Sequence, residues 1–285
     1  MWFSSKEFKL RILFNLSQNY KKVSLFIINS LKEVISKNLS KEDHSKSMFI
    51  EDVHVVEGTY LTQAKTLRFW SSFFVILPIF LQAPWVRFQP NSALLFTFFI
   101  LATGIFLSSE PSKKFFIIGS LLFGVAGSWL GGSLFWGWLS AHPILHIPVE
   151  AVALPLALIG LGTKWKIGSS FYIASLFGTA ITDLTIFFTG LMDRWMEVIN
   201  ADAEIAPLIL QETSENLINI KPLSIILLIG FSLWLLSKKI AEYSSINTSN
   251  GRSALVSSYV LQTTLIVDGI FILLAIIQPN LSGLV

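Results

Sequence analysis

Residues 115–139 read FFIIGSLLFGVAGSWLGGSLFWGWL, an uninterrupted stretch of 25 residues without a charged side chain. A helix that crosses the hydrocarbon core of a membrane needs about 20 apolar residues. The composition of the whole chain agrees, because 53% of its 285 residues are hydrophobic and only 14% are charged, against about 25% in ordinary soluble domains. The sequence therefore predicts an all-α integral membrane protein and excludes a soluble enzyme, a disordered chain and a nucleic-acid-binding domain.

Similar apolar stretches lie on both sides of this one. Together they predict seven spans, at about 69–86, 92–109, 115–139, 144–161, 167–191, 222–237 and 253–277. The fourth span is the weakest, because Pro148, Glu150 and Pro155 interrupt it. Prolines remove a helical hydrogen bond, so this span is predicted to be kinked or broken. The predicted fold class is a polytopic bundle of about seven transmembrane helices.

Positive charges indicate how these spans are oriented, because Lys and Arg favour the cytoplasmic side of a membrane. With the N-terminus inside, the inside segments hold 18 of the 21 Lys and Arg, and the outside loops hold three. This alternation predicts a cytoplasmic N-terminus and an external C-terminus. The long external loop, residues 192–221, is acidic and carries a partial apolar stripe. We expect an amphipathic helix there that acts as a cap or docking surface, and the alternative is a solvated loop.

The first 68 residues differ in character from the rest of the chain. They hold eleven of the 21 Lys and Arg, which predicts a basic cytoplasmic tail, residues 1–68, ahead of a transmembrane bundle, residues 69–285. Apolar residues recur at helical spacing near residues 21–37, with basic residues on much of the other face. This pattern predicts an amphipathic helix, either on an anionic membrane surface or packed on the protein's own cytoplasmic face.

Three carboxylates lie inside predicted spans, namely Glu150, Asp183 and Asp268, and His146 precedes Glu150 by one helical turn. None of the predicted spans contains a Lys or Arg to pair with them. Ionisable side chains inside a membrane are costly, so they usually face the bundle interior and mark function. At 1.5 Å per residue, all three acids lie about 9–14 Å below the outer boundary. We predict that they form one polar binding site with His146, which could bind a cation, relay protons or coordinate a metal.

The alternative is that each acid forms a local hydrogen bond that joins neighbouring helices. Four threonines are available as partners: Thr182, Thr185, Thr263 and Thr264. The nature of any metal stays open on the sequence alone. His142, one turn before His146, is expected at a loop or interface rather than in the site.

Small residues recur four apart in the third predicted span. Gly127 and Gly131 are spaced in this way, Gly132 follows Ser128 by four residues, and Gly137 follows Ser133 by four. This spacing lets helix backbones approach closely, so we assign these glycines to helix packing. A platform for a ligand is the alternative interpretation.

Familiar catalytic chemistry finds no support in the sequence. The chain has no cysteine, which excludes disulfides and thiolate chemistry. The phosphate-binding, zinc-protease, serine-hydrolase and aspartyl-protease motifs are all missing from the sequence. We therefore predict no cofactor and no catalytic residue, and we give an enzyme the lowest rank among the functions considered.

Four strings together resemble a known family: QAPWVRF at 82–88, SWLGGSLFWGWLSAHPILHIPVEAVALPLAL at 128–158, FYIASLFGTAITDL at 171–184 and VDG at 267–269. The chain resembles an uncharacterised family of multi-pass membrane proteins from cyanobacteria, catalogued as a domain of unknown function. The resemblance covers about residues 69–277 and supplies no activity or site residue. It implies a photosynthetic bacterial host, and hence the plasma membrane or the thylakoid membrane.

Two classes of function stay open. The first is a carrier or channel for a small solute or cation, in which Glu150, Asp183 and Asp268 form the polar site and His146 modulates it. The second is a non-catalytic assembly or scaffold factor for a membrane complex, which in a photosynthetic host could be a photosynthetic complex. It would contact a membrane-protein partner through the third span and residues 192–221. In both classes the protein lies in the lipid bilayer and has no nucleic-acid partner. The oligomeric state stays open in both.

Overall fold

The computed structural model describes residues 63–202, 205–244 and 248–277. Within these ranges the chain forms helices and turns and has no β-strand. Seven of its helices are long and apolar enough to cross a membrane. The predicted fold class, a helical bundle of seven spans, is thereby confirmed. The predicted amphipathic helix near residues 21–37 lies outside the described residues.

The seven helices overlap the predicted spans, but the first begins six residues earlier and the sixth ends five residues later than predicted. Their bounds are Gln63–Phe88, Pro90–Ser109, Lys113–Leu139, Pro143–Gly160, Lys166–Phe188, Ile220–Glu242 and Ser249–Leu274. The second is α4 and the fifth is α8, while the sixth is α11 and the seventh lies within α12, Ser249–Ile277. The third consists of α5, Lys113–Leu134, and the π-helical turn η2, Phe135–Leu139.

Besides the third helix with its π-helical turn, the first and the fourth are irregular, and in these two prolines lie at the irregular points. The first passes through the π-helix η1, Pro78–Gln82, before it ends as α3, Ala83–Phe88. The fourth is divided into η3, Pro143–Leu145, α6, His146–Glu150, η4, Ala151–Ala153, and α7, Leu154–Gly160. Pro155 has no N–H for the carbonyl of Ala151, and the N–H of Leu154 donates to that carbonyl instead, in a tighter 3₁₀ turn. The predicted break in this span is confirmed.

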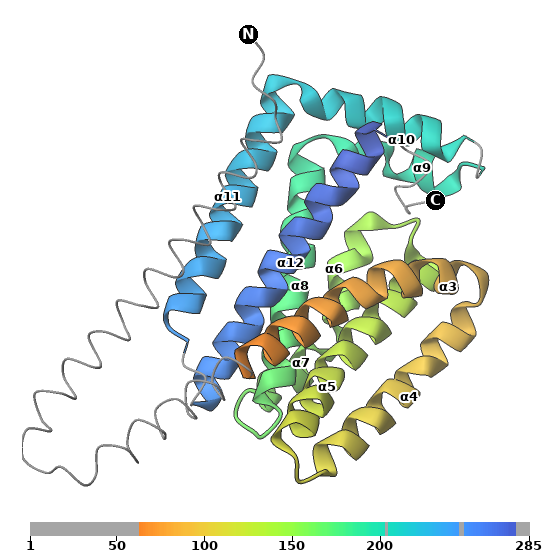
Figure 1. Ribbon diagram of the computed structural model, residues 1–285. Coiled ribbons are helices and arrows are strands. Elements are labelled where there is room, and N and C mark those ends of the chain that lie inside the picture. Colours follow the sequence, from red (N-terminus) through yellow and green to blue (C-terminus); the bar gives the residue numbers. More distant parts are fainter. Residues whose placement is uncertain (1–62, 203–204, 245–247, 278–285) are drawn as a thin grey trace, which may run out of the picture. The chain divides into compact units, whose positions relative to one another are not determined.

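Helix α5 is the most buried part of the bundle. It packs against α4 and α8, and α8 packs in turn against α12, which also contacts α11 (Figure 1). Trp129 of α5 is fully buried and donates from its indole Nε1 to the carbonyl of Ala93 at 2.7 Å. The amide of Gln82 donates to the carbonyl of Trp129 at 2.6 Å and to the hydroxyl of Ser133 at 2.8 Å. Side-chain hydrogen bonds therefore connect three spans at the centre of this core.

The outward faces of the bundle are apolar. Phe98 on α4 and Leu228 on α11 are each 68% exposed, and many large apolar side chains beside them are similarly exposed. Such a surface suits contact with lipid tails rather than water, because soluble proteins rarely expose large contiguous apolar patches. The outward faces agree with the lengths of the helices and support a membrane location.

A helical cap connects α8 to α11. It consists of η5, Leu191–Arg194, α9, Trp195–Asn200, α10, Ala206–Glu215, and η6, Asn216–Ile218. Figure 1 shows α9 and α10 lying across the end of the bundle, and α10 contacts α12. Ala206, Thr213 and Leu217 are buried, whereas Ile205, Leu208 and Ile218 are exposed. Only part of the apolar stripe of this acidic segment therefore faces the protein.

Candidate functional site

His146 lies between two carboxylates from different helices. Its Nδ1 is 2.9 and 3.0 Å from the two carboxylate oxygens of Asp183 on α8. Its Nε2 is 3.2 Å from Oε1 of Glu150, one turn further along the fourth span. Neutral imidazole has a single N–H, so this geometry requires either an imidazolium that donates to both carboxylates or a protonated carboxyl group on one side. The three residues, His146, Glu150 and Asp183, are called the ion cluster below.

The close approach of the fourth span to α5 positions this cluster. A Cβ atom at Gly131 would lie 2.7 Å from the Cα of Glu150, so the two backbones meet where α5 has no side chain. The hydroxyl of Tyr172 on α8 donates to the carbonyl of Glu150 at 2.5 Å. The imidazole of His146 stacks on the ring of Phe135, with centroids 4.2 Å apart. These contacts fix the backbone of Glu150 and the ring plane of His146.

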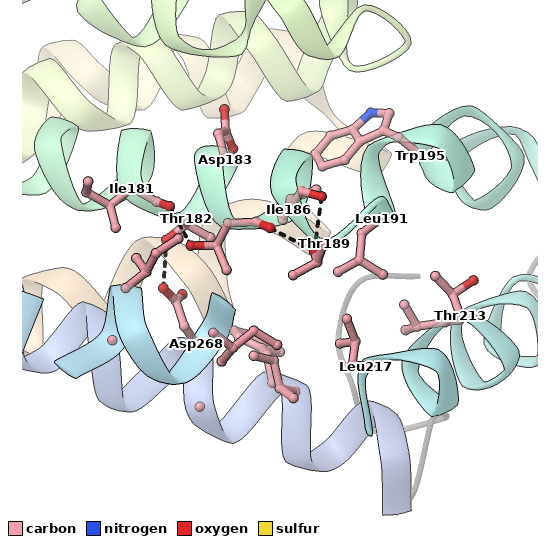
Figure 2. Close-up of a pocket in the computed structure, with 18 of the residues that line it drawn as sticks. Ile181, Thr182, Asp183, Ile186, Thr189, Leu191, Trp195, Thr213, Leu217 and Asp268 are labelled. Carbon is pink, nitrogen blue, oxygen red and sulfur yellow. Dashed lines mark hydrogen bonds between the residues drawn. The ribbon is translucent and has the colours of Figure 1, made fainter. Parts of the chain in front are cut away.

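Asp268 on α12 is placed differently. Its Oδ2 accepts a hydrogen bond from the hydroxyl of Thr182 at 2.6 Å. Thr182 and Asp183 are consecutive on α8, and consecutive helical positions point about 100° apart. As Figure 2 shows, Thr182 points toward Asp268 while Asp183 points away from α12. Helix α8 therefore separates Asp268 from the ion cluster, and one of the predicted threonine partners is used.

Both aspartates nevertheless line one cavity of about 370 Å³ (Figure 2). Its walls come from α8, the cap, α11 and α12, together with Trp136 of η2. Most lining residues are apolar, and the polar ones are few: Thr182, Asp183, Thr185, Thr189, Arg194, Thr213 and Asp268. Cavities that bind small molecules in proteins combine a mainly apolar lining with a few polar groups in this way.

Arg194 is the basic residue of this lining, and the cap engages it. Its guanidinium is 2.7 Å from Oε2 of Glu197 and 3.0 Å from Oε2 of Glu212. The neighbouring Trp195 donates from its indole to the carbonyl of Ser140 at 2.8 Å and stacks on Trp136. The ion pairs of Arg194 thus join parts of the cap to one another, and the contacts of Trp195 attach the cap to the end of the third span.

The structure therefore brings together three of the four residues predicted for the polar site. Glu150, Asp183 and His146 are in contact, and Asp268 joins only Asp183, through the cavity that both line. His142 is exposed, in the turn that precedes η3. Sequence reasoning missed the contribution of the cap to the cavity and the roles of Tyr172 and Gln82. For Gln82, a lone amide beside a long apolar stretch was the available signal.

The four glycines assigned to helix packing face several neighbours. A Cβ at Gly127 would lie 2.9 Å from the ring of Tyr172. A Cβ at Gly132 would lie 3.1 Å from the amide of Gln82, and one at Gly137 would lie 3.1 Å from Pro90. With Gly131 against Glu150, these positions place the third span, α5 with η2, close to the first, second, fourth and fifth spans.

Across residues 63–202, 205–244 and 248–277, no group of three or more His, Cys, Asp or Glu side chains is arranged to hold a metal ion.

Comparisons with known proteins add a family but no activity. The family model described as "Protein of unknown function (DUF3120)" matches residues 71–276. No curated protein and no solved structure matches the chain.

Proposed function

The chain belongs to the DUF3120 family of proteins of unknown function, and on that premise we propose that it is a carrier or channel for a small solute or cation. The observation that supports this proposal is the cavity, because acidic residues from two different spans, Asp183 and Asp268, are among those that line it, with the carboxylate of Asp183 directed toward His146. Ionisable groups at membrane depth are costly, and in transporters they mark the paths of ions and substrates. Asp183 and Asp268 are the proposed polar site.

In this proposal His146 and Glu150 act on the polar site indirectly. They do not line the cavity, but His146 contacts both oxygens of Asp183. A proton gained or lost within the ion cluster changes the charge that Asp183 presents to the cavity. His146 is therefore proposed to modulate the site, and Glu150 to share its proton.

The orientation and location of the protein are part of the same proposal. We place the N-terminus in the cytoplasm and the C-terminus outside, since this arrangement puts 18 of the 21 Lys and Arg on the inner side. The cap and the cavity then lie at the outer side of the membrane. A cyanobacterial host, with the plasma or thylakoid membrane as the site, is the matching proposal for location.

Uptake by proteoliposomes tests the proposed function. The full chain is reconstituted in liposomes, and entry of radiolabelled tetraethylammonium and of potassium is compared with that in protein-free liposomes. We expect uptake of at least one probe by the wild type and its loss in Asp183→Asn and Asp268→Asn. Asp193→Asn is the matched control, because Asp193 is an exposed cap residue that does not line the cavity.

Equal uptake by the wild type and the two cavity variants would overturn the proposal. If the wild type carries no flux and all variants retain a co-purifying membrane-protein partner, the assembly or scaffold hypothesis replaces it. In that case, changes in the third span or in residues 192–221 should release the partner.

A further inference from the structure

We propose that the cavity binds a monovalent organic cation with an apolar body, and that Asp268 holds the charged group of this ligand. The proposal rests on the proposed function and narrows its substrate class. It concerns the same cavity, and it is argued from the balance of charge, the character of the walls and the available space.

The first step is the balance of charge around the cavity. Asp268 accepts a hydrogen bond from the hydroxyl of Thr182, and the ion pairs formed by the described residues do not include it. Asp183 shares the single imidazole of His146 with Glu150. A buried carboxylate is stabilised by an opposite charge or by protonation. The carboxylate of Asp268 therefore has no positively charged partner among the ion pairs of the described residues. A cationic ligand in the cavity would supply one.

Arg194 does not supply that charge. Its guanidinium pairs with Glu197 and Glu212 within the cap, so one cation already faces two anions there. The cavity consequently has the carboxylate of Asp268 at the α12 wall and a neutralised arginine at the cap wall. This distribution disfavours an anionic ligand near Asp268 and favours a cationic one.

The second step is the character of the walls. Apart from its few polar residues, the lining consists mostly of aliphatic side chains such as Ile186, Ile229 and Leu265. A hydrated inorganic ion would have to lose its bound water beside these apolar walls, which offer few oxygen atoms in exchange. Ca²⁺, for example, needs about six to eight oxygen ligands. An organic cation with an apolar body satisfies the walls and the carboxylate together. Trp136 and Trp195 also line the cavity, and their rings offer a large apolar surface to the body of such a ligand.

The third step is size. The cavity volume of about 370 Å³ falls at the lower end of the range of roughly 300–1,000 Å³ for small-molecule sites. It suits a ligand with one ring or a few short alkyl groups rather than a whole lipid. Figure 2 shows Asp268 and Thr182 at one side of this space and Leu191, Thr213 and Leu217 of the cap region at the other. The charged group is therefore placed at the α12 side, with the apolar body toward the cap.

The test is binding of benzyltrimethylammonium, compared with neopentylbenzene, which has the same shape with carbon in place of the charged nitrogen. Binding to the full chain in lipid nanodiscs is measured by equilibrium dialysis of the radiolabelled compounds. We expect the cation to bind about tenfold or more tightly than its neutral analogue, because its positive charge is attracted to the carboxylate of Asp268 in a mainly apolar cavity, whereas the neutral analogue gains only contact with the walls. Asp268→Asn should remove this preference, while Asp268→Glu and Asp193→Asn should keep it.

A cavity-filling variant guards against the failure of Asp268→Asn to fold. Ile229→Trp adds bulk to the α11 wall without touching a carboxylate, and it should abolish binding of the cation while thermal unfolding remains cooperative. Equal binding of the cation and the neutral analogue, or full binding by a folded Asp268→Asn, would overturn the inference.

The inference and the proposed function fail separately. Wild-type protein that binds benzyltrimethylammonium but carries none of the probes across the membrane refutes transport and upholds the inference. Uptake of potassium that Asp183→Asn abolishes, with no binding of benzyltrimethylammonium, upholds transport and refutes the inference.

Discussion

The contact of one imidazole with two carboxylates has an energetic consequence at the scale of the residue. The side chains of His146, Glu150 and Asp183 are only 8%, 17% and 14% exposed. Removing the imidazole would leave two acidic groups facing each other across a poorly hydrated space. A buried ion pair contributes little when whole, but the loss of one partner is strongly destabilising because the other charge stays buried.

We therefore predict that His146→Ala lowers the free energy of unfolding by about 3 kcal/mol, the lower part of the range for a broken buried pair. His142→Ala is the matched control, since His142 is exposed and lies one turn away; it should change stability by less than about 0.5 kcal/mol. Reversible unfolding of the detergent-solubilised protein in SDS, followed by far-ultraviolet circular dichroism, measures both. Equal stability of the two variants would show that the ion cluster does not stabilise the fold.

How far the sequence predicts the site depends on what each residue reveals by itself. Glu150, Asp183 and Asp268 are visible as carboxylates in apolar stretches. Their partners are not visible, because the contact of His146 with Asp183 depends on how the fourth and fifth spans are rotated against each other. The adjacent Thr182 faces another helix altogether. The spacing of residues along one span carries no information on how the neighbouring span is rotated about its own axis.

At the scale of the element, the fourth span shows how a break is used. Its 3₁₀ turn at Ala151–Ala153 directly follows the last residue of α6, Glu150. The prolines predicted this break, but the glycine that accommodates it lies on another helix. Gly131 permits the backbone of Glu150 to approach α5 so closely that a Cβ atom does not fit. The spacing of small residues indicated close packing and left the identity of the partner undetermined.

Gly131→Ala is accordingly predicted to destabilise the protein by about 1–3 kcal/mol, the usual cost of forcing an extra carbon into a well-packed contact. Gly269→Ala serves as control, because a Cβ at Gly269 meets nothing within 4 Å and alanine is the better helix former. Thermal unfolding of the two variants in the same detergent compares them. A Gly131→Ala protein as stable as Gly269→Ala would mean that α5 and the fourth span can separate without loss.

The cap is the element that the sequence described least completely. Its acidic residues and partial apolar stripe predicted a helix, and the structure contains α9 and α10 in this segment. Amphipathicity shows that one face is buried but does not identify what covers it. The role of Leu217 and Thr213 as walls of a cavity shared with α8 and α12 depends on contacts between segments far apart in the sequence.

At the scale of the whole molecule, the proposed orientation is open to direct measurement because the chain has no cysteine. A single introduced thiol therefore reports without background. We predict that a membrane-impermeant maleimide applied from outside to intact cells labels Glu215→Cys in the cap and does not label Ser112→Cys, which lies between α4 and α5. Both positions are exposed. Labelling of Ser112→Cys alone would reverse the proposed orientation.

The division of the cavity among the spans also bears on how the protein is made. The residues of the ion cluster come from the fourth and fifth spans and are positioned by the third, whereas the cavity also needs α11 and α12. Chains leave the ribosome at about 5–20 residues per second, N-terminus first. About 80 residues separate the end of α8 from Asp268, so roughly 4–16 s of translation divide the two events. A five-span nascent chain can therefore complete its charge cluster while the walls of the cavity are still being synthesised.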